Sequence, residues 1–188
     1  MPRLPYVDPA NAPPAVREAL EAIPPLNIFR TLAHAETAFR PALRLGGALL
    51  TEAELDNRLR ELAILRVAAQ DEAEYEWIQH AAIARSVGAT DEQVAAIERG
   101  DIEADCFDET DRLVLGFASE VIEGGASEAT FVAASKRFSP REVVELLLTI
   151  GYYMMLARVM RSVDIDLDEP AGSSVVDSAR RGGGEGED

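Results

Sequence analysis

The feature that most constrains the fold is a long apolar segment in the C-terminal part of the chain. After Ser139-Pro140-Arg141-Glu142 the sequence continues VVELLLTIGYYMMLARVM, which is apolar nearly all round. Serine before proline, with glutamate at the third helical position, is typical of a helix start. A helix this apolar must be buried in a core or in a subunit interface. Because charged residues interrupt the run, we expect no transmembrane helix.

The rest of the pattern also favours helices. Ala, Leu and Glu dominate the composition, and runs of Val and Ile bounded by turn residues are few, which argues against strands. Thr51-Glu52-Ala53-Glu54 has the form of a capping box, and it predicts a helix from there to about Ala69. Gly46 and Gly47 would let another helix approach closely, or would mark a bend. The sequence therefore predicts an all-α bundle of about seven or eight helices without a sheet.

Proline and glycine divide the chain into three parts. Residues 1–25 contain several prolines and are interpreted as an extended arm with a short helix. Residues 26–168 are expected to form one helical domain, since the chain is long enough for a substantial core. Residues 169–188 are rich in Gly, Ser and acidic residues, and we expect this tail to be disordered. The arm would lie either on its own core or on a neighbouring subunit.

Charge and cysteine content exclude several classes of function. The formal net charge is −16, so nucleic acid and anionic membrane are poor partners. Cys106 is the single cysteine, which excludes an intramolecular disulfide and a cysteine-based zinc cluster. The N-terminus lacks the apolar run of a signal peptide. The single cysteine and the N-terminus fit a cytoplasmic protein, whereas the charge does not identify a substrate.

The segment from Arg60 to His80 holds the best candidates for chemistry. Glu76 and His80 are four residues apart, so they share one face of a helix. A turn near Gln70–Ala73 would bring Glu61 back across from them. Two carboxylates and an imidazole between packed helices would form an acid–base site, or a site for a divalent metal. The alternatives are an exposed Glu76–His80 pair, and a Glu61 that is exposed or pairs with Arg58 or Arg66.

The same segment carries a family resemblance. Arg60-Glu61-Leu62-Ala63-Ile64-Leu65, followed by Glu74-Tyr75-Glu76-Trp77-Ile78-Gln79-His80, resembles the carboxymuconolactone decarboxylase family, which includes alkylhydroperoxidase D-like proteins. The likeness continues in the segment that begins at Ser139, and it covers about residues 26–168. It implies an all-α, alkylhydroperoxidase D-like fold and a homo-oligomer, either a trimer or a hexamer.

The resemblance also bears on peroxidase activity. In the peroxidase branch of the family, a glutamate is followed by a CxxC pair and then by a histidine. The glutamate and the histidine correspond here to Glu61 and His80, but the cysteine positions hold Ala73 and Glu76. Reduction of peroxide through a disulfide needs a thiolate nucleophile and a resolving thiol. An alkylhydroperoxidase or peroxiredoxin-like antioxidant is therefore the disfavoured alternative. A non-catalytic oligomeric binding protein that kept the fold and lost the chemistry is the other alternative.

The remaining resemblance is to the decarboxylase branch and implies a carboxy-lyase that needs no cofactor or metal. Its acid–base chemistry would act on a small oxo-acid or lactone, by decarboxylation or proton transfer. On this hypothesis His80 is the proton shuttle, Glu76 orients its imidazole, and Glu61 is a second acid or base. Arg66 or Arg30 would hold a substrate carboxylate. The further candidates for substrate binding are Trp77, Tyr75 and His34.

Overall fold

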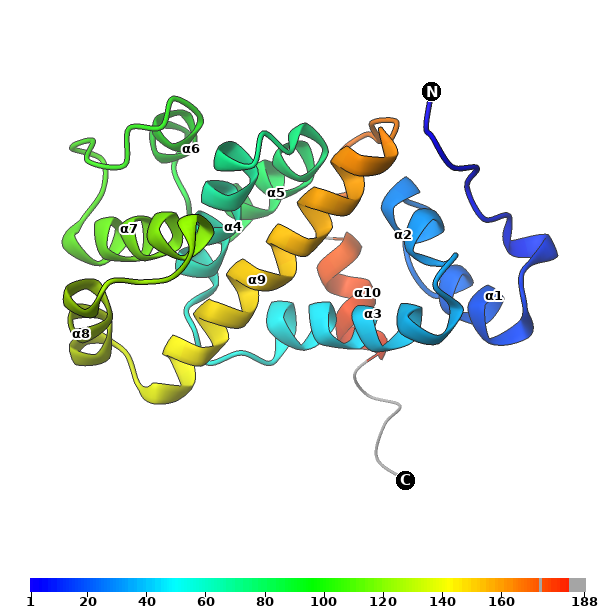
Figure 1. Cartoon of the computed structure of the whole chain (residues 1–188), viewed down its shortest axis with the longest axis horizontal. Coiled ribbons are helices and arrows are strands. Elements are labelled where there is room, and N and C mark those ends of the chain that lie inside the picture. The colour runs from blue at the N-terminus through cyan, green and yellow to red at the C-terminus, as the bar shows by residue number, and fades with distance from the viewer. Residues whose placement is uncertain (173, 183–188) are drawn as a thin grey trace.

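The computed structural model describes residues 1–172 and 174–182, and these form a bundle of α-helices without a strand (Figure 1). The all-α fold predicted from the sequence is confirmed, with ten α-helices in the described residues rather than seven or eight. A 3-10 turn, η1 (Pro9–Asn11), precedes them. The helices are α1 (Pro14–Glu21), α2 (Asn27–Leu32), α3 (Glu36–Thr51), α4 (Asn57–Gln70), α5 (Glu74–Ser86), α6 (Asp91–Glu98), α7 (Glu109–Glu123), α8 (Glu128–Arg137), α9 (Pro140–Val163) and α10 (Ser174–Gly182).

Side-chain caps fix the starts of five helices in the described residues, namely α4, α6, α7, α8 and α9. The side chain of Ser139 accepts a hydrogen bond from the backbone N–H of Glu142, and the side chain of Glu142 accepts one from the backbone N–H of Ser139. Helix α9 therefore begins with a full capping box. Thr90 caps α6 in the same way. One expected cap is wrong: Thr51 ends α3, donating to the carbonyl of Gly47, and Asp56 caps α4 instead. Between them, the N–H of Leu55 donates to Glu145 on α9, which holds the chain outside either helix.

Helix α4 is the centre of the molecule. It packs against α5, α6, α7 and α9, and its apolar residues from Leu62 to Val67 are fully buried. A helix with neighbours on nearly every side cannot have a solvated face. Two charged residues of α4, Arg60 and Glu61, are therefore forced into the interior.

Helix α9 is long and apolar enough to cross a bilayer by length and composition, and half of that stretch is buried within the fold. It packs against α3, α4, α7 and α8, as expected for a core helix (Figure 1). Its burial is not complete, because Val144, Leu148 and Met155 are 44–53% exposed along one face. The pattern of α9 alone could not show which of its faces the fold would cover.

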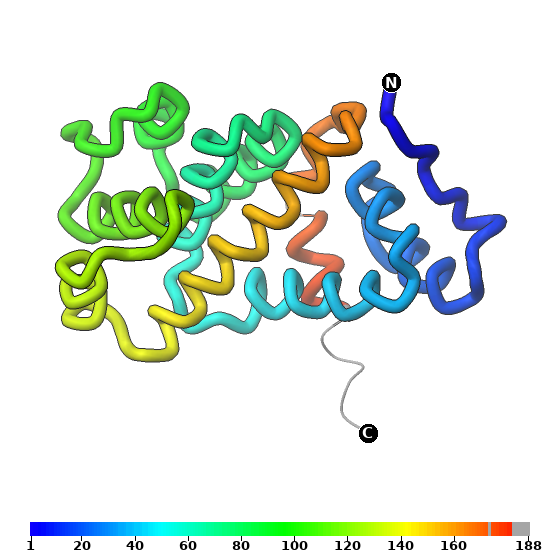
Figure 2. The backbone as a smooth tube through the Cα atoms, in the orientation of Figure 1, coloured from blue at the N-terminus to red at the C-terminus, as the bar shows by residue number. Residues whose placement is uncertain are grey.

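The two ends of the chain pack on the same part of the bundle. The N-terminal arm lies beside the C-terminal end of α9, where the N–H of Arg3 donates to the carbonyl of Val163 at 2.7 Å (Figure 2). The arm therefore lies on its own core. The division into three parts stays a prediction, but the tail is not disordered throughout, because α10 packs on α3. Within the predicted tail, residues 173 and 183–188 lie outside the described residues.

The adjacent glycines of α3 allow close helix approach, as the sequence suggested. A Cβ atom on Gly46 would lie 2.5 Å from the hydroxyl oxygen and 2.8 Å from the ring carbon Cζ of Tyr152 on α9. A Cβ atom on Gly47 would lie 3.6 Å from Cβ of Ala179 on α10, which is ordinary contact. The two positions thus differ. At position 46 a side chain would clash with Tyr152, so glycine is needed there, whereas position 47 has room for a methyl group.

We expect Gly46→Ala to lower the free energy of unfolding by about 1–3 kcal/mol, because the added methyl displaces Tyr152 from its packed position. Gly47→Ala is the matched control in the same helix. It should be neutral or stabilising by up to about 1 kcal/mol, since alanine is the better helix former. Urea unfolding of both variants measures the difference, and equal effects would contradict this account.

Candidate active site

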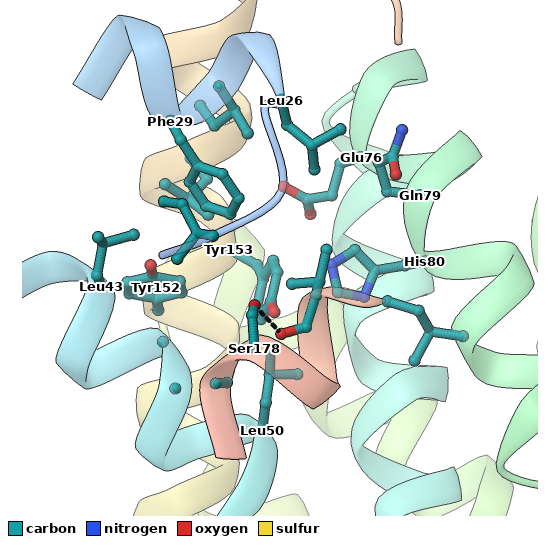
Figure 3. Close-up of a pocket in the computed structure, with 18 of the residues that line it drawn as sticks. Leu26, Phe29, Leu43, Leu50, Glu76, Gln79, His80, Tyr152, Tyr153 and Ser178 are labelled. Atoms are coloured by element: carbon teal, nitrogen blue, oxygen red, sulfur yellow. Dashed lines mark hydrogen bonds between the residues drawn. The ribbon is translucent and has the colours of Figure 1, made fainter. Parts of the chain in front are cut away.

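One cavity of about 120 Å³ lies between α2, α3, α5, α9 and α10. Glu76 and His80 reach it from α5, and Tyr152 and Tyr153 reach it from α9 (Figure 3). The remaining walls are aliphatic or aromatic, and no Arg or Lys in the described part of the chain lines them. The other lining residues include Ile23, Leu26, Ile28, Phe29, Leu43, Leu50, Tyr75, Gln79, Ile83, Leu156, Met160, Val175, Ser178 and Ala179.

Behind the pocket wall, a buried ion pair holds His80. Glu61 is fully buried, and its Oε2 lies 2.8 Å from Nδ1 of His80. Its other oxygen, Oε1, accepts from Nε and Nη2 of Arg60, each at 3.2 Å. Arg60 in turn donates to Oδ1 of Asn57 at 2.7 Å. Because the carboxylate of Glu61 lies beside a guanidinium, it acts as an acceptor, and the Nδ1–H of His80 donates a hydrogen bond to it. Nε2 is then the ring nitrogen that is free to exchange protons.

This geometry corrects the role expected for Glu76. The sequence placed Glu76 beside His80 on one helix face and predicted that it would orient the imidazole. The partner of the ring is Glu61, from the neighbouring helix α4. The turn between the helices makes this possible: Glu72 adopts a positive φ of 50°, and the N–H of Ala73 donates to the carbonyl of Ala68 at 2.8 Å. The predicted turn near Gln70–Ala73 and the approach of Glu61 are thus confirmed.

Glu76 lies in the pocket without a hydrogen-bond partner. Its side chain is almost fully buried, and neither carboxylate oxygen has a partner in the described residues. Figure 3 shows its carboxyl group pointing into the space lined by Leu26 and Tyr153. Burial, together with the negative charges of Asp71 and Glu61, raises the pKa of Glu76 well above its usual value. A buried carboxyl group without a cation beside it favours the neutral form, in which Glu76 can donate a proton.

Two tyrosines of α9 complete the polar part of the pocket. The ring of Tyr153 meets His80 edge-on, with centroids 4.7 Å apart, and Tyr152 meets Tyr153 in the same manner at 5.4 Å. The hydroxyl of Tyr152 donates to the carbonyl of Ala42 at 3.1 Å. Burial raises the pKa of Tyr153 well above its usual value, and that of Tyr152 to about 12. Both hydroxyls are neutral near pH 7 and serve as walls and hydrogen-bonding groups.

Four of the residues predicted to bind substrate lie outside the pocket lining. Arg66 donates to Oγ of Ser119, on the side of α4 that faces α7. Arg30 donates to the carbonyl of Val7 and lies over the ring of Tyr6. These two arginines stabilise packing, so neither can hold a substrate carboxylate in this cavity. The other two are Trp77, which packs on the core, and His34, whose Nε2 hydrogen-bonds the carbonyl of Pro5.

Tyr75, the fifth residue predicted to bind substrate, does line the pocket, but its hydroxyl is occupied. It donates to Asp168, which also accepts from the backbone N–H of Asn27 at 2.6 Å. Burial and this hydrogen bond raise the pKa of Tyr75. Beside it, the amide of Gln79 donates to the carbonyls of Asp168 and Glu169 and accepts from the N–H of Ala171. These contacts hold the chain that leads into α10 across the pocket.

Sequence reasoning missed Arg60, Gln79, Asp168 and the α10 residues. Arg60 and Gln79 stand inside the segment singled out from the sequence, and a charged residue next to Glu61 could have suggested an ion pair. Asp168 and α10 gave no such signal, because their composition is that of a linker. In the described part of the chain, no group of three His, Cys, Asp or Glu side chains is arranged to hold a metal ion.

The fold and the site together define an all-α protein with alkylhydroperoxidase D-like architecture. The family model of the carboxymuconolactone decarboxylase family matches residues 36–120. This match confirms the resemblance seen in the sequence, over a segment that holds Glu61, Glu76 and His80.

Solved structures share this fold at low sequence identity. An uncharacterized peroxidase-related protein from Ralstonia eutropha JMP134, described as an alkylhydroperoxidase AhpD core, has a TM-score of 0.76 and 21% identity over 89% of this chain and 92% of its own. An uncharacterized peroxidase-related protein from Silicibacter sp. TM1040 has a TM-score of 0.74 and 19% identity, covering 88% and 90%.

A third structure is that of a protein of unknown function from Agrobacterium tumefaciens, named as a candidate antioxidant defence protein of AhpD type. It has a TM-score of 0.65 and 21% identity, over 72% of this chain and 94% of its own. The search of curated proteins finds no match. At these identities the structures establish the fold, while the chemistry has to be argued from the residues of this chain.

The neutral state of Glu76 predicts a pH-dependent stability. The folded protein keeps a proton on Glu76 at pH values where the unfolded chain, with a pKa near 4.5, has released it. The contribution of Glu76 is therefore fully present below about pH 4.5 and is lost as pH rises toward the raised pKa. We expect the free energy of unfolding of the native protein, relative to Glu76→Gln, to fall by up to about 1.4 kcal/mol per pH unit in this window.

Denaturant unfolding at a series of pH values measures this slope. Glu74→Gln is the matched control, because Glu74 is exposed on the same helix. That substitution should leave the pH dependence of the native protein unchanged. Parallel curves for the native protein and Glu76→Gln would show that Glu76 is ionised in the folded state.

Proposed function

We propose that this protein is a cofactor-independent acid–base enzyme of the carboxymuconolactone decarboxylase type, acting on a small lactone or oxo-acid. The observation that supports it best is the pairing of two differently held groups in one apolar pocket: a neutral acid, Glu76, and an imidazole, His80, held by a buried carboxylate. Titratable groups whose environments differ in this way are suited to opposite roles in proton transfer.

The roles follow from the environment of each group. A carbonyl oxygen next to Glu76 would accept a hydrogen bond from the neutral acid, which stabilises the negative charge that develops when a bond at the neighbouring carbon breaks. Nε2 of His80 would remove a proton from that carbon or return one to it. Glu61 would keep the ring oriented and would stabilise the imidazolium during the transfer. The apolar walls strengthen these interactions because they exclude water.

The two reactions suggested for the site place different demands on it. Decarboxylation requires a bound substrate carboxylate, and the arginines expected to hold one lie elsewhere. Proton transfer next to a carbonyl requires only the groups that line the pocket. We therefore propose proton transfer as the primary step, with loss of CO₂ as a further step for a substrate that carries a single carboxylate beside His80.

The thiol peroxidase alternative has no support from the cysteine of this chain. Cys106, the single cysteine, does not line the pocket, and burial raises the pKa of its thiol. A reactive cysteine needs the opposite shift. Consumption of hydroperoxide with a dithiol reductant would revive this alternative. The homo-oligomer and the cytoplasmic location stay predictions.

The function is tested by the loss of His80. Small lactones and oxo-acids are incubated with the protein in D₂O, and deuterium incorporation next to the carbonyl and release of CO₂ are both followed. We expect His80→Ala to lower the rate by about 10²–10⁴-fold, because it removes the group that carries the proton. His34→Ala is the matched control and should keep the native rate. Native activity in a folded His80→Ala protein would contradict the proposal.

A further inference from the structure

The unpartnered carboxyl group of Glu76 points to the chemistry of the ligand. Both of its oxygens are buried and have no hydrogen-bond partner among residues 1–172 and 174–182, although most buried polar groups in proteins are hydrogen-bonded. An unsatisfied buried group of this kind is destabilising, and a bound partner would recover the lost hydrogen bond. A neutral carboxylic acid presents an O–H donor, so the matching ligand group is a hydrogen-bond acceptor.

The surroundings of Glu76 select against a charged acceptor. No Arg or Lys among the described residues lines the cavity, and the carboxylates of Asp71 and Glu61 lie close enough to affect Glu76. His80 is the one lining residue that can become cationic, and its Nδ1 is already bonded to Glu61. Moving an anion from water into an apolar site without a cation is strongly unfavourable. A ligand with two carboxylates would meet this cost twice.

The cavity also limits the size of the ligand. Its volume of about 120 Å³ is close to that of an engineered apolar cavity of about 150 Å³ that binds benzene. Leu26, Phe29 and Leu50 supply flat or branched apolar walls that suit a ring (Figure 3). The site is thus matched to one small ring with a short substituent.

We propose that the pocket takes a small, uncharged cyclic carbonyl compound, whose carbonyl oxygen accepts a hydrogen bond from the carboxylic acid of Glu76. This inference rests on the proposed function, because it names the substrate class of the same site. Of the two substrate classes proposed above, uncharged lactones fit the pocket, whereas oxo-acids in their ionised form do not, so the inference keeps the proton-transfer step and excludes loss of CO₂ from a charged substrate.

The test uses three probes of nearly the same shape. Acetophenone carries an uncharged carbonyl, benzoate replaces its methyl group with a charged oxygen, and α-methylstyrene replaces its carbonyl oxygen with CH₂. Dissociation constants are measured near pH 7 by calorimetry. The NMR signals of His80 report occupancy of the pocket, with His34 as an internal reference outside it. We expect acetophenone to bind at least about tenfold more tightly than either other probe.

Two variants assign the difference to Glu76. Glu76→Gln keeps a neutral donor of the same shape, so it should bind acetophenone within about threefold of the native protein, whereas Glu76→Leu should bind it at least about tenfold more weakly. If Glu76→Leu does not fold, the three probes and the Glu76→Gln variant still test the inference. Tighter binding of benzoate, equal binding of α-methylstyrene, or no binding of acetophenone would overturn the inference.

The outcome is distinguishable from a failure of the proposed function, since binding requires no turnover. If acetophenone binds as expected while His80→Ala keeps the native rate, the ligand class stands and the catalytic role fails. If benzoate binds best while His80 is essential for turnover, the catalytic role stands and the ligand class fails.

Discussion

The structure of the candidate site depends on one buried ion pair. Glu61 lies in the helix at the centre of the bundle, where a carboxylate without a partner would be strongly destabilising. Arg60, its neighbour in the chain, is also buried and supplies the positive charge. The other oxygen of Glu61, Oε2, accepts a hydrogen bond from Nδ1 of His80 on α5. The position of the imidazole is therefore a consequence of how α4 is buried.

Two glutamates in adjacent helices have opposite environments. Glu61 has a cation and a histidine as partners, whereas Glu76 has apolar walls and the negative charges of Asp71 and Glu61 near it. The same side chain is thus held as a hydrogen-bonding anion at one position and as a neutral acid at the other. A pocket that contains both an oriented imidazole and a neutral acid has the parts needed for proton transfer at carbon without a cofactor.

The C-terminal segment closes this pocket, although its composition is typical of a disordered linker. Asp168 bonds Tyr75 and the backbone of Asn27, and Gln79 holds the following residues. These contacts bring α10 against α3, where Ala179 lies next to Gly47.

The sequence by itself determined the all-α class, the start of α9 at Ser139 and the meeting of Glu61 with His80, because caps, helical spacing and a short turn are local properties of the chain. Only the tertiary structure decided which partner orients His80, why Arg66 and Arg30 lie outside the pocket, and that α4 rather than α9 is the fully surrounded helix. Those outcomes depend on contacts between residues far apart in the chain, and on how much water each helix face retains after packing. No local pattern encodes either quantity.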